Sequence, residues 1–365
     1  MSTASEFLTG PVARSAAAQA ARRERWAPRI SRVSGFLNIL GLGWFVPLLR
    51  IAAGEPVKPQ LLELWRSFGI PMAAIVLFLA AWGFLAPKVH TSLGVLPGPV
   101  QVWQQAESLW ADHLAERAKK QAFYERQKKR NAELLASDPK ADVKIRPYTG
   151  APTYLDQIIT SLETVFTGFI FAALVAVPLG VLCGLSQTVN TAINPLVQIF
   201  KPVSPLAWLP LVTMVVSALY VSADPLFPKS FLISAITVTL CSLWPTLINT
   251  AVGVASIDKD LINVSRVLRL HWTTKVIKIV LPSSLPLIFT GLRLSLGVGW
   301  MVLIAAEMLA QNPGLGKFVW DEFQNGSSAS LSRIMVAVFT IGIIGFLLDR
   351  IMLALQVAFT HGETR

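Results

Sequence analysis

The sequence predicts an all-α membrane protein, a polytopic helical bundle with about six transmembrane helices. Hydrophobic residues make up 53% of the chain and charged residues only 15%, whereas about a quarter of the residues of a soluble domain are charged. No Asp, Glu, Lys or Arg occurs in residues 164–200 or in residues 230–257. A helix needs about 20 apolar residues to cross a bilayer, and both runs are longer than that.

The apolar runs define six expected spans. They lie at residues 67–87, 161–185, 202–221, 231–252, 285–309 and 334–357. Prolines within three of them predict breaks in the helices, because proline removes a backbone donor; they are Pro178, Pro205, Pro210 and Pro245. An even number of spans places both chain ends on the same side of the membrane.

The polar segments set the expected domain organisation. Residues 1–66 are expected to form a cytoplasmic tail and an interfacial helix, and residues 67–360 a transmembrane domain. Within the former, residues 31–53 fit either a span or an interfacial helix; we prefer the latter, because a span would carry the Arg-rich N-terminus outside. Residues 258–279 are rich in Lys and Arg and are expected to be cytoplasmic.

Residues 88–160 are then an extracytoplasmic insertion. This segment is also basic, but it is longer than about 60 residues, and in loops of that length positive charge no longer predicts the side of the membrane. Residues 101–135 contain few helix breakers and many Ala, Glu, Lys and Gln residues. They predict one or two solvated helices.

Motifs for catalysis and cofactor binding are missing. The string Gly314-Leu315-Gly316-Lys317 lacks the upstream glycine and the hydroxyl residue of a nucleotide-binding loop. The 4 His residues are scattered, and Cys183 and Cys241 lie inside apolar runs, so no metal site is expected. The net charge of +11 forms no basic stripe interleaved with aromatic residues, which argues against a nucleic-acid partner. We therefore expect neither an enzyme nor a resident cofactor.

A short amphipathic helix is predicted within the basic segment 260–279. Its apolar residues recur at a spacing near 3.6 residues; they are Leu261, Val264, Val267 and Leu268. Such a helix either rests on the membrane surface or seats its apolar side in a groove of a partner protein.

Several strings, in order, resemble one family. The string LINVSRVLRLHWTTKVIKIVLPSSLPLIFTGLRLSLGVGWMVLIAAEML at residues 261–309 looks like the coupling segment and following span of ABC importer permeases of the nitrate, bicarbonate and cyanate group and of the sulfonate and taurine group. LPGPVQVW at 96–103, KPVSPLAWLPL at 201–211, WPTLINTAVGV at 244–254, GLGKFVWD at 314–321 and GFLLDR at 345–350 agree. The resemblance covers residues 96–350, with 106–153 as an insertion.

The resemblance implies a type I ABC importer permease in the bacterial inner membrane. The partners it implies are a second permease subunit, ATP-binding subunits that hydrolyse the ATP, and a periplasmic substrate-binding protein. Nitrate or nitrite is the expected substrate, with sulfonate or taurine, bicarbonate and cyanate as alternatives. An ATP-independent secondary transporter is the mechanistic alternative, although it predicts inverted repeats, which the sequence does not show, and more intramembrane acids than the sequence contains.

The family's coupling signature reads Glu-Ala-Ala, three residues, then Gly. The matching positions here are Asn263, Val264, Ser265 and Arg269, so neither the acid nor the glycine is kept. The expected ATPase-coupling residues are Leu261, Asn263, Val264, Ser265, Arg266, Leu268 and Arg269, with the two arginines reaching acidic groups at the rim of the partner's groove.

The fifth span carries two charges, Arg293 and Glu307. Because charge is costly in a bilayer, each either reaches one membrane surface or lines a translocation path. Fourteen positions of helix separate them by about 21 Å, so they do not pair with each other. Trp300 and Met301, between them, are expected to act as gate or packing residues.

Overall fold

The computed structural model confirms the all-α fold class. It describes residues 26, 30, 33–35, 37, 41, 43–91, 94–137, 143, 145–221, 225–327 and 329–360. The helices and strands, in order, are η1 Gly43–Phe45, α2 Val46–Ala52, α3 Val57–Leu64, η2 Trp65–Gly69, α4 Ile70–Leu85, η3 Ala86–Lys88, β1 His90–Thr91, β2 Gly94–Val95, α5 Pro99–Ser137, α6 Tyr154–Leu185, α7 Gln187–Phe200, α8 Pro205–Leu219, α9 Lys229–Ala255, α10 Lys259–Val267, α11 Trp272–Lys275, η4 Val276–Val280, α12 Leu281–Ala310, α13 Leu315–Asn325 and α14 Ser330–Thr360.

The chain divides into two compact units. One comprises Met1–Leu85 with Asp349–Arg365, and the other Ala86–Leu348. In the first unit, α3, η2 and α4 make a continuous apolar stretch whose most apolar window is not buried by the protein, as expected of a lipid-facing span. The predicted tail falls largely outside the described residues. The helical stretch Gly43–Ala52 is short for a span, and its interfacial placement stays a prediction.

The described part of the chain contains about the predicted number of spans. Five helices are long and apolar enough to cross a membrane, and a sixth span is completed if the bent pair of α7 and α8 is counted as one. The two helices of this pair meet at 101°. The third predicted span therefore differs from expectation: α8 has only 15 residues, and Lys201–Ser204 separates it from α7.

Three of the four prolines do not break their spans, whereas Pro205 is the first residue of α8, directly after the 101° bend. Pro178, Pro210 and Pro245 lie inside α6, α8 and α9, which continue as helices. At Pro245 a neighbouring helix repairs the backbone: the N–H of Thr246 donates to Ser295 Oγ of α12 at 3.0 Å, and that hydroxyl donates to the carbonyl of Ser242. One side chain thus bridges an opened backbone hydrogen bond, which explains why the expected break is absent.

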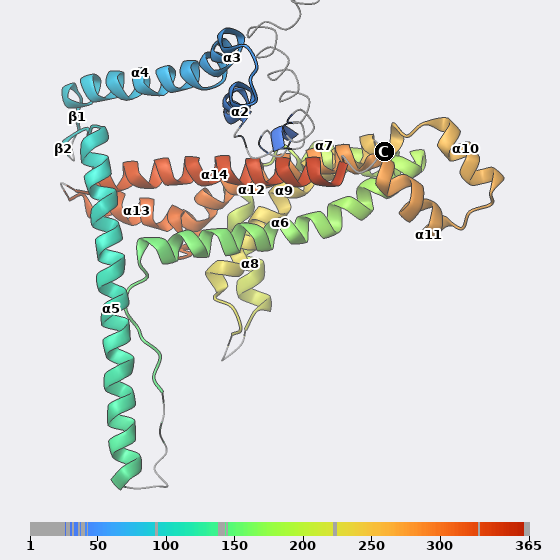
Figure 1. Ribbon diagram of the computed structural model, residues 1–365. Coiled ribbons are helices and arrows are strands. Elements are labelled where there is room, and N and C mark those ends of the chain that lie inside the picture. The colour runs from blue at the N-terminus through green and yellow to red at the C-terminus, as the bar shows by residue number, and fades with distance from the viewer. Residues whose placement is uncertain are drawn as a thin grey trace, which may run out of the picture. The chain divides into compact units, whose positions relative to one another are not determined.

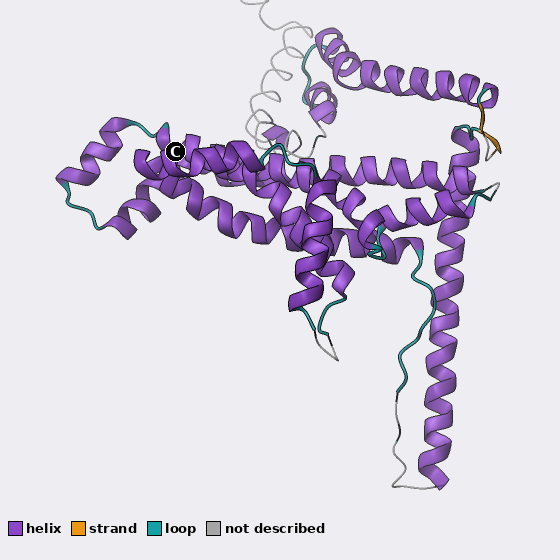
Figure 2. Ribbon diagram, turned by 180° about the vertical axis from the view of Figure 1, so that it is seen from behind, coloured by secondary structure: helices purple, strands orange, loops and turns teal. Residues whose placement is uncertain are grey.

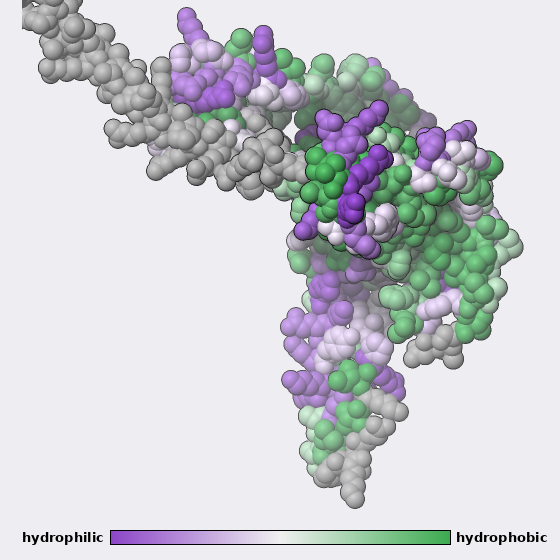
Figure 3. All heavy atoms as spheres, turned by 90° about the vertical axis from the view of Figure 1, so that its right-hand side faces the viewer, coloured by the Kyte–Doolittle hydropathy of each residue, from purple (hydrophilic) through white to green (hydrophobic). Residues whose placement is uncertain are grey.

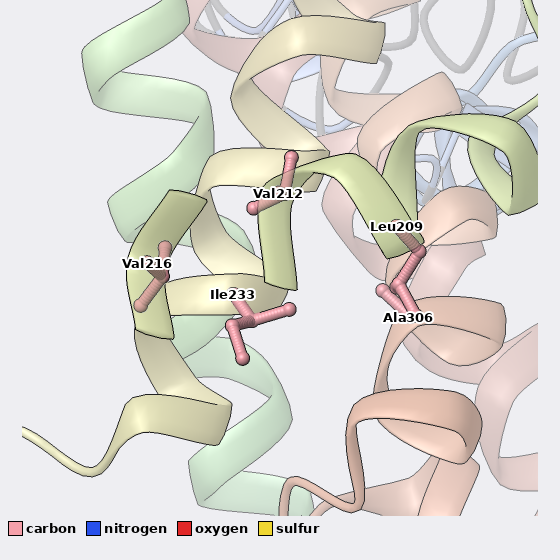
Figure 4. Packing of buried hydrophobic residues seen from close by; sticks show 5 residues of the cluster. All are labelled: Leu209, Val212, Val216, Ile233 and Ala306. Atoms are coloured by element: carbon pink, nitrogen blue, oxygen red, sulfur yellow. The ribbon is translucent and has the colours of Figure 1, made fainter. Parts of the chain in front are cut away.

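The core of the second unit forms around α9, which packs against both α6 and α12. α8 closes one side of it. Leu209, Val212 and Val216 of α8 meet Ile233 of α9 and Ala306 of α12, and all five are buried (Figure 4). Between membrane helices such side chains contribute mainly close van der Waals packing, because lipid tails are as apolar as they are. This packing holds the short helix in place.

The insertion forms one long helix, α5, rather than two. Neither Gly nor Pro occurs between Pro99, at its first turn, and Ser137, at its end. α5 runs crosswise to the bundle of α6, α9 and α12, at the end opposite to α10 and α11 (Figures 1 and 2). It is held there by Arg117, whose guanidinium lies 2.7 Å from Asp156 of α6, and by Asp112, 3.7 Å from Arg333 of α14.

The chain returns from the end of α5 alongside the helix. Tyr148 Oη donates to Glu116 Oε1 at 2.6 Å, and the Tyr148 backbone N–H donates to Tyr124 Oη at 3.2 Å. The side-chain hydrogen bond lowers the pKa of the Glu116 carboxyl and raises the pKa of the Tyr148 hydroxyl. Phe123 packs against the Tyr148 ring, with centroids 5.4 Å apart. The helix and its return segment therefore form one folded arm.

Candidate functional site

The predicted coupling helix is α10. It starts at Asp258, whose side chain accepts from the N–H of Asp260 at 2.9 Å. It ends at Val267, and Arg269, the residue after the C-cap Leu268, has a φ of +48°. The Arg269 and Leu270 N–H groups donate to the carbonyls of Arg266 and Ser265, which closes the last turn.

Arg269 occupies the position where the family signature has glycine. A left-handed backbone costs a side-chain-bearing residue about 1–2 kcal/mol, whereas glycine adopts it freely. Arg269 adopts this left-handed backbone, so the chain carries here a cost that a glycine at the same position would avoid.

The apolar residues of α10 are turned away from their own chain. Leu261, Val264 and Leu268 are 44%, 50% and 63% exposed. Ser265, in contrast, is buried, and its hydroxyl donates to the carbonyl of Ile262 at 2.6 Å. A helix that presents apolar side chains at the end of a bundle and rests on it with its other side has the geometry of a docking helix.

Beside this surface lies a groove between α10 and the ends of α6 and α9. Its cavity volume is 380 Å³. Asn263 and Arg266 line it together with Lys275 and the apolar residues Leu185 and Val254. Six of the seven predicted coupling residues therefore fall into three places: an exposed apolar surface, a basic groove and a buried serine. The seventh, Arg269, is exposed beyond the end of the helix and does not line the groove.

The predicted path residues all lie on α12 but in different surroundings. Arg293 is half-buried. Met301 is 69% exposed on the outside of the chain. Trp300 is buried, and its Nε1–H donates to the Ile341 carbonyl of α14 at 3.0 Å. Trp300 thus joins two helices, and its neighbour Met301 points out of them.

Glu307 is completely buried and surrounded by donors. Ser161 Oγ of α6 lies 2.8 Å and 2.9 Å from its two carboxylate oxygens. The N–H of Gly316 donates to Oε2 at 2.9 Å, and the N–H of Leu315 donates to Ser161 Oγ at 2.9 Å. These contacts compensate the cost of removing the charge from water.

This carboxylate replaces the missing cap of α13. Gly314 precedes the helix and has no side chain to accept from its first N–H groups. Glu307 and Ser161 accept from them instead, and an anion is favoured at a helix N-terminus. A Cβ on Gly314 would overlap the Glu307 carboxylate, so any side chain here would have to displace that carboxylate from its donors. Glu307 therefore fixes α12, α13 and α6 to one another.

The residues predicted as a site are not brought together in one place. Arg293 and Glu307 are apart, as expected, and the α10 residues lie at the end of the bundle away from α5 (Figure 1). Sequence reasoning missed Ser161 and Gly314 as partners of Glu307. The sequence indicates Gly314 and Gly316 as part of an incomplete nucleotide motif and of the family string GLGKFVWD, but not that they admit a carboxylate from the preceding span.

Apolar helices of spanning length, with a short docking helix at one end, are typical of transporter membrane subunits. A family model defines the class: residues 176–361 match the binding-protein-dependent transport system inner membrane component. The match covers half of the chain, and a relative reported below is similar over most of its length. The chain therefore belongs to this family, the permeases of ABC importers, and is a multi-pass inner membrane protein.

Two relatives come from Synechococcus elongatus. The nitrate import permease protein NrtB is 37% identical over 196 residues, which cover 54% of this chain and 66% of the relative, slightly less than two thirds of its length. The bicarbonate transport system permease protein CmpB is 32% identical over 309 residues, covering 82% of this chain and 93% of the relative. A solved structure of the inward-facing MetNI methionine ABC transporter matches 57% of this chain and 96% of that chain, with a TM-score of 0.49 and 16% identity.

Proposed function

We propose that this permease is the membrane subunit of an ATP-driven importer of a small inorganic anion, with nitrate or nitrite as the substrate. The observation that carries the proposal is the exposed apolar surface of α10, which offers a place for a separate ATP-binding subunit. The chain itself has no nucleotide-binding motif. A second permease subunit, two ATP-binding subunits and a periplasmic substrate-binding protein would complete the assembly.

Two substrates are supported by named relatives. A nitrate permease and a bicarbonate permease resemble the chain at 37% and 32% identity. Bicarbonate is therefore the second candidate, ahead of sulfonates, taurine and cyanate. Both favoured ions are small and planar and carry one negative charge, and both suit the half-buried cation Arg293 on α12.

Within the bundle we propose that Arg293 and Met301 line the path, while Trp300 and Glu307 fix the helix that carries them. α12 follows directly on α11 and η4, so a movement of the α10–α11 segment is transmitted to it along the chain. ATP-driven closure of partner subunits then shifts α12 between two positions. A docked α10 is necessary, because a ligand changes a conformational equilibrium only through contacts that differ between the two states.

The coupling proposal is tested by a double substitution of Leu261→Asp and Leu268→Asp. Burying a leucine in a partner groove contributes roughly 1.5–3 kcal/mol, and two buried unpaired carboxylates add a further penalty. We expect the ATP-binding subunit, co-expressed from the neighbouring gene, to be lost from the tagged permease on purification. Thr273→Asp is the matched control, since Thr273 is exposed in the same basic segment but lies on α11, outside the apolar surface of α10.

Equal recovery of the ATP-binding subunit from both variants, with uptake preserved, would remove the coupling role of α10 and favour a secondary transporter. The substrate is assigned separately, with the complete complex reconstituted in vesicles. Nitrate, nitrite, bicarbonate and taurine are each added with the substrate-binding subunit, and ATP hydrolysis is measured. Stimulation by bicarbonate alone would contradict the nitrate assignment and leave the coupling assignment intact.

A further inference from the structure

The arm built on α5 has no part in the proposed transport mechanism. We define the basic arm as residues 118–137 of α5 with the described return residues 143 and 145–153. Figure 3 shows this projection as mainly hydrophilic, with hydrophobic atoms near its far end. Its helical part carries Lys119, Lys120, Arg126, Lys128, Lys129 and Arg130 against Glu125 and Glu133.

A pocket opens on one side of the basic arm. It has a volume of 310 Å³ and is lined by Phe123, Arg126, Gln127, Arg130 and Arg146. Among the described residues, no ion pair joins any of these three arginines to a carboxylate. Arg126 Nε donates to the Ala122 carbonyl at 3.2 Å, but no described carboxylate neutralises the three guanidinium groups. Like charges around one cavity repel each other, so an anion placed between them is favoured.

Gln127 gives a second, independent indication that the pocket binds a ligand. Its side chain is only 6% exposed although it sits on a solvated arm. Its Oε1 accepts no hydrogen bond from any described residue. A buried acceptor without a donor costs free energy, and native structures leave few of them. The pocket is therefore complementary to an anion that also carries a hydrogen-bond donor.

The guanidinium fork matches phosphate oxygens two at a time. A phosphate that is linked to a hydroxyl-bearing group supplies both the anion for the arginines and a donor for Gln127. Leu134, Leu135 and Ile145 add exposed apolar surface on the same arm, and Ile145 is 75% exposed. Arginines beside exposed aliphatic side chains are typical of segments that rest on anionic membrane surfaces.

The position of α5 agrees with that ligand. The helix lies crosswise to α6 and α12, which traverse the membrane, so it runs along the membrane surface (Figure 1). Beyond its contact with Asp156, about 20 residues of helix project by roughly 30 Å. At this level phospholipid headgroups are the most abundant phosphate.

We propose that the basic arm lies on the membrane surface and that its three-arginine pocket binds the glycerophosphate headgroup of an anionic phospholipid such as phosphatidylglycerol. The inference does not depend on the ATP-binding partner or on the imported ion.

The test uses the full-length permease in detergent, carrying an environment-sensitive fluorophore on Ser137→Cys at the end of α5. Short-chain phosphatidylglycerol, phosphatidic acid, phosphatidylcholine and inorganic phosphate are titrated separately. The pocket variant replaces Arg126, Arg130 and Arg146 by Gln. The control variant replaces Lys119, Lys128 and Lys129 by Gln, which removes the same charge from the same arm but none from the pocket.

We expect phosphatidylglycerol to bind more tightly than the other three probes. The pocket variant should weaken it by about ten-fold or more, since each basic residue near an anionic surface contributes about 1 kcal/mol, and the control variant should weaken it far less. Gln127→Leu should abolish the preference for phosphatidylglycerol over phosphatidic acid. This last variant keeps all three arginines and separates hydroxyl recognition from charge.

Three results would overturn the proposal. Equal weakening by the pocket and control variants would mean unspecific attraction of charges. Inorganic phosphate that binds as tightly as the lipid would make the ligand a free ion. If the pocket variant instead bound lipid normally but lost the substrate-binding subunit in a pull-down, the arm would be a protein-docking surface.

Discussion

The Glu307 carboxylate occupies the space that a side chain at position 314 would need. A Cβ at position 314 would meet Glu307 Oε1 at 2.1 Å. Gly314→Ala should therefore destabilise the permease by about 1–3 kcal/mol, the usual cost of overpacking. The loss is measured as a lower thermal midpoint in detergent, with Gly297→Ala as control, because a Cβ at Gly297 meets nothing within 4 Å.

A double-mutant cycle identifies the cause. Glu307→Ala alone should also be destabilising, since it leaves the Gly316 N–H and the Ser161 hydroxyl without their acceptor. In that background Gly314→Ala should cost much less, because the carboxylate it met is gone. If the two losses simply add, the close approach of these residues is not the reason for the glycine.

Arg293 is the one residue of the proposed path whose charge is fixed at every physiological pH. Arg293→Gln should reduce uptake of the imported anion several-fold and leave the amount of assembled complex unchanged. Arg293→Lys keeps a positive charge and should retain more activity. Uptake that is normal in Arg293→Gln at normal expression would mean that this side chain reaches the membrane surface instead of lining the path.

The sequence could identify unusual residues at this scale but not their neighbours. A charge at Glu307 within an apolar run is visible in one dimension, and its rarity marks it as important. Its donor Ser161 is 146 positions away, and no local pattern connects the two. The same holds for Ser295, which repairs α9 at Pro245 from another helix. Pro245 predicted a break because the rule for proline considers only its own helix and not a side chain that bridges the gap from another helix.

Between α6 and α9, close approach of two helices depends on small residues. A Cβ on Gly184 would lie 2.7 Å from the backbone carbonyl of Ala251 and 2.5 Å from Val254 Cβ. Backbone cannot yield as a flexible side chain does, so Gly184→Ala should push the helices apart. We expect a lower thermal midpoint and faster proteolysis than in Gly297→Ala, the control on α12. Wild-type stability would mean that the two helices separate without cost.

Hydrophobic periodicity and helix-breaking residues predicted some helices correctly and left others undecided. α10 was predictable because its apolar residues recur at the helical spacing, and the absence of Gly and Pro favoured a long α5. Whether residues 101–135 form one helix or two is not a local property, since the contacts of Arg117 and Tyr148 hold α5 in place from distant segments. The 101° bend between α7 and α8 likewise depends on burial of α8 against α9 and α12.

At the scale of the whole molecule, six apolar runs and a family resemblance predicted the fold class, because a bilayer allows few solutions to backbone hydrogen bonding. The side on which each polar segment lies is harder to predict. Both the segment 258–279 and the insertion 88–160 are basic, and the rule for positive charge is weak for the longer one. The structure adds that α10 and α5 lie at opposite ends of the α6, α9 and α12 bundle (Figure 1).

We therefore predict that Ser137 and Ser256 lie on opposite sides of the inner membrane, with Ser137 outside. Both residues are exposed, one at the end of α5 and one after α9. Each is changed to cysteine in a background with Cys183→Ala and Cys241→Ala, and intact cells are treated with a membrane-impermeant thiol reagent. Ser137→Cys should react at once, whereas Ser256→Cys should react only after the inner membrane is permeabilised.

Reaction of Ser256→Cys alone would invert the topology, and reaction of both in intact cells would contradict the placement of α5 and α10 at opposite membrane surfaces. Since the ATP-binding partner is cytoplasmic, an inverted result would also remove α10 as its docking helix, which makes this labelling the experiment to perform before any coupling variant.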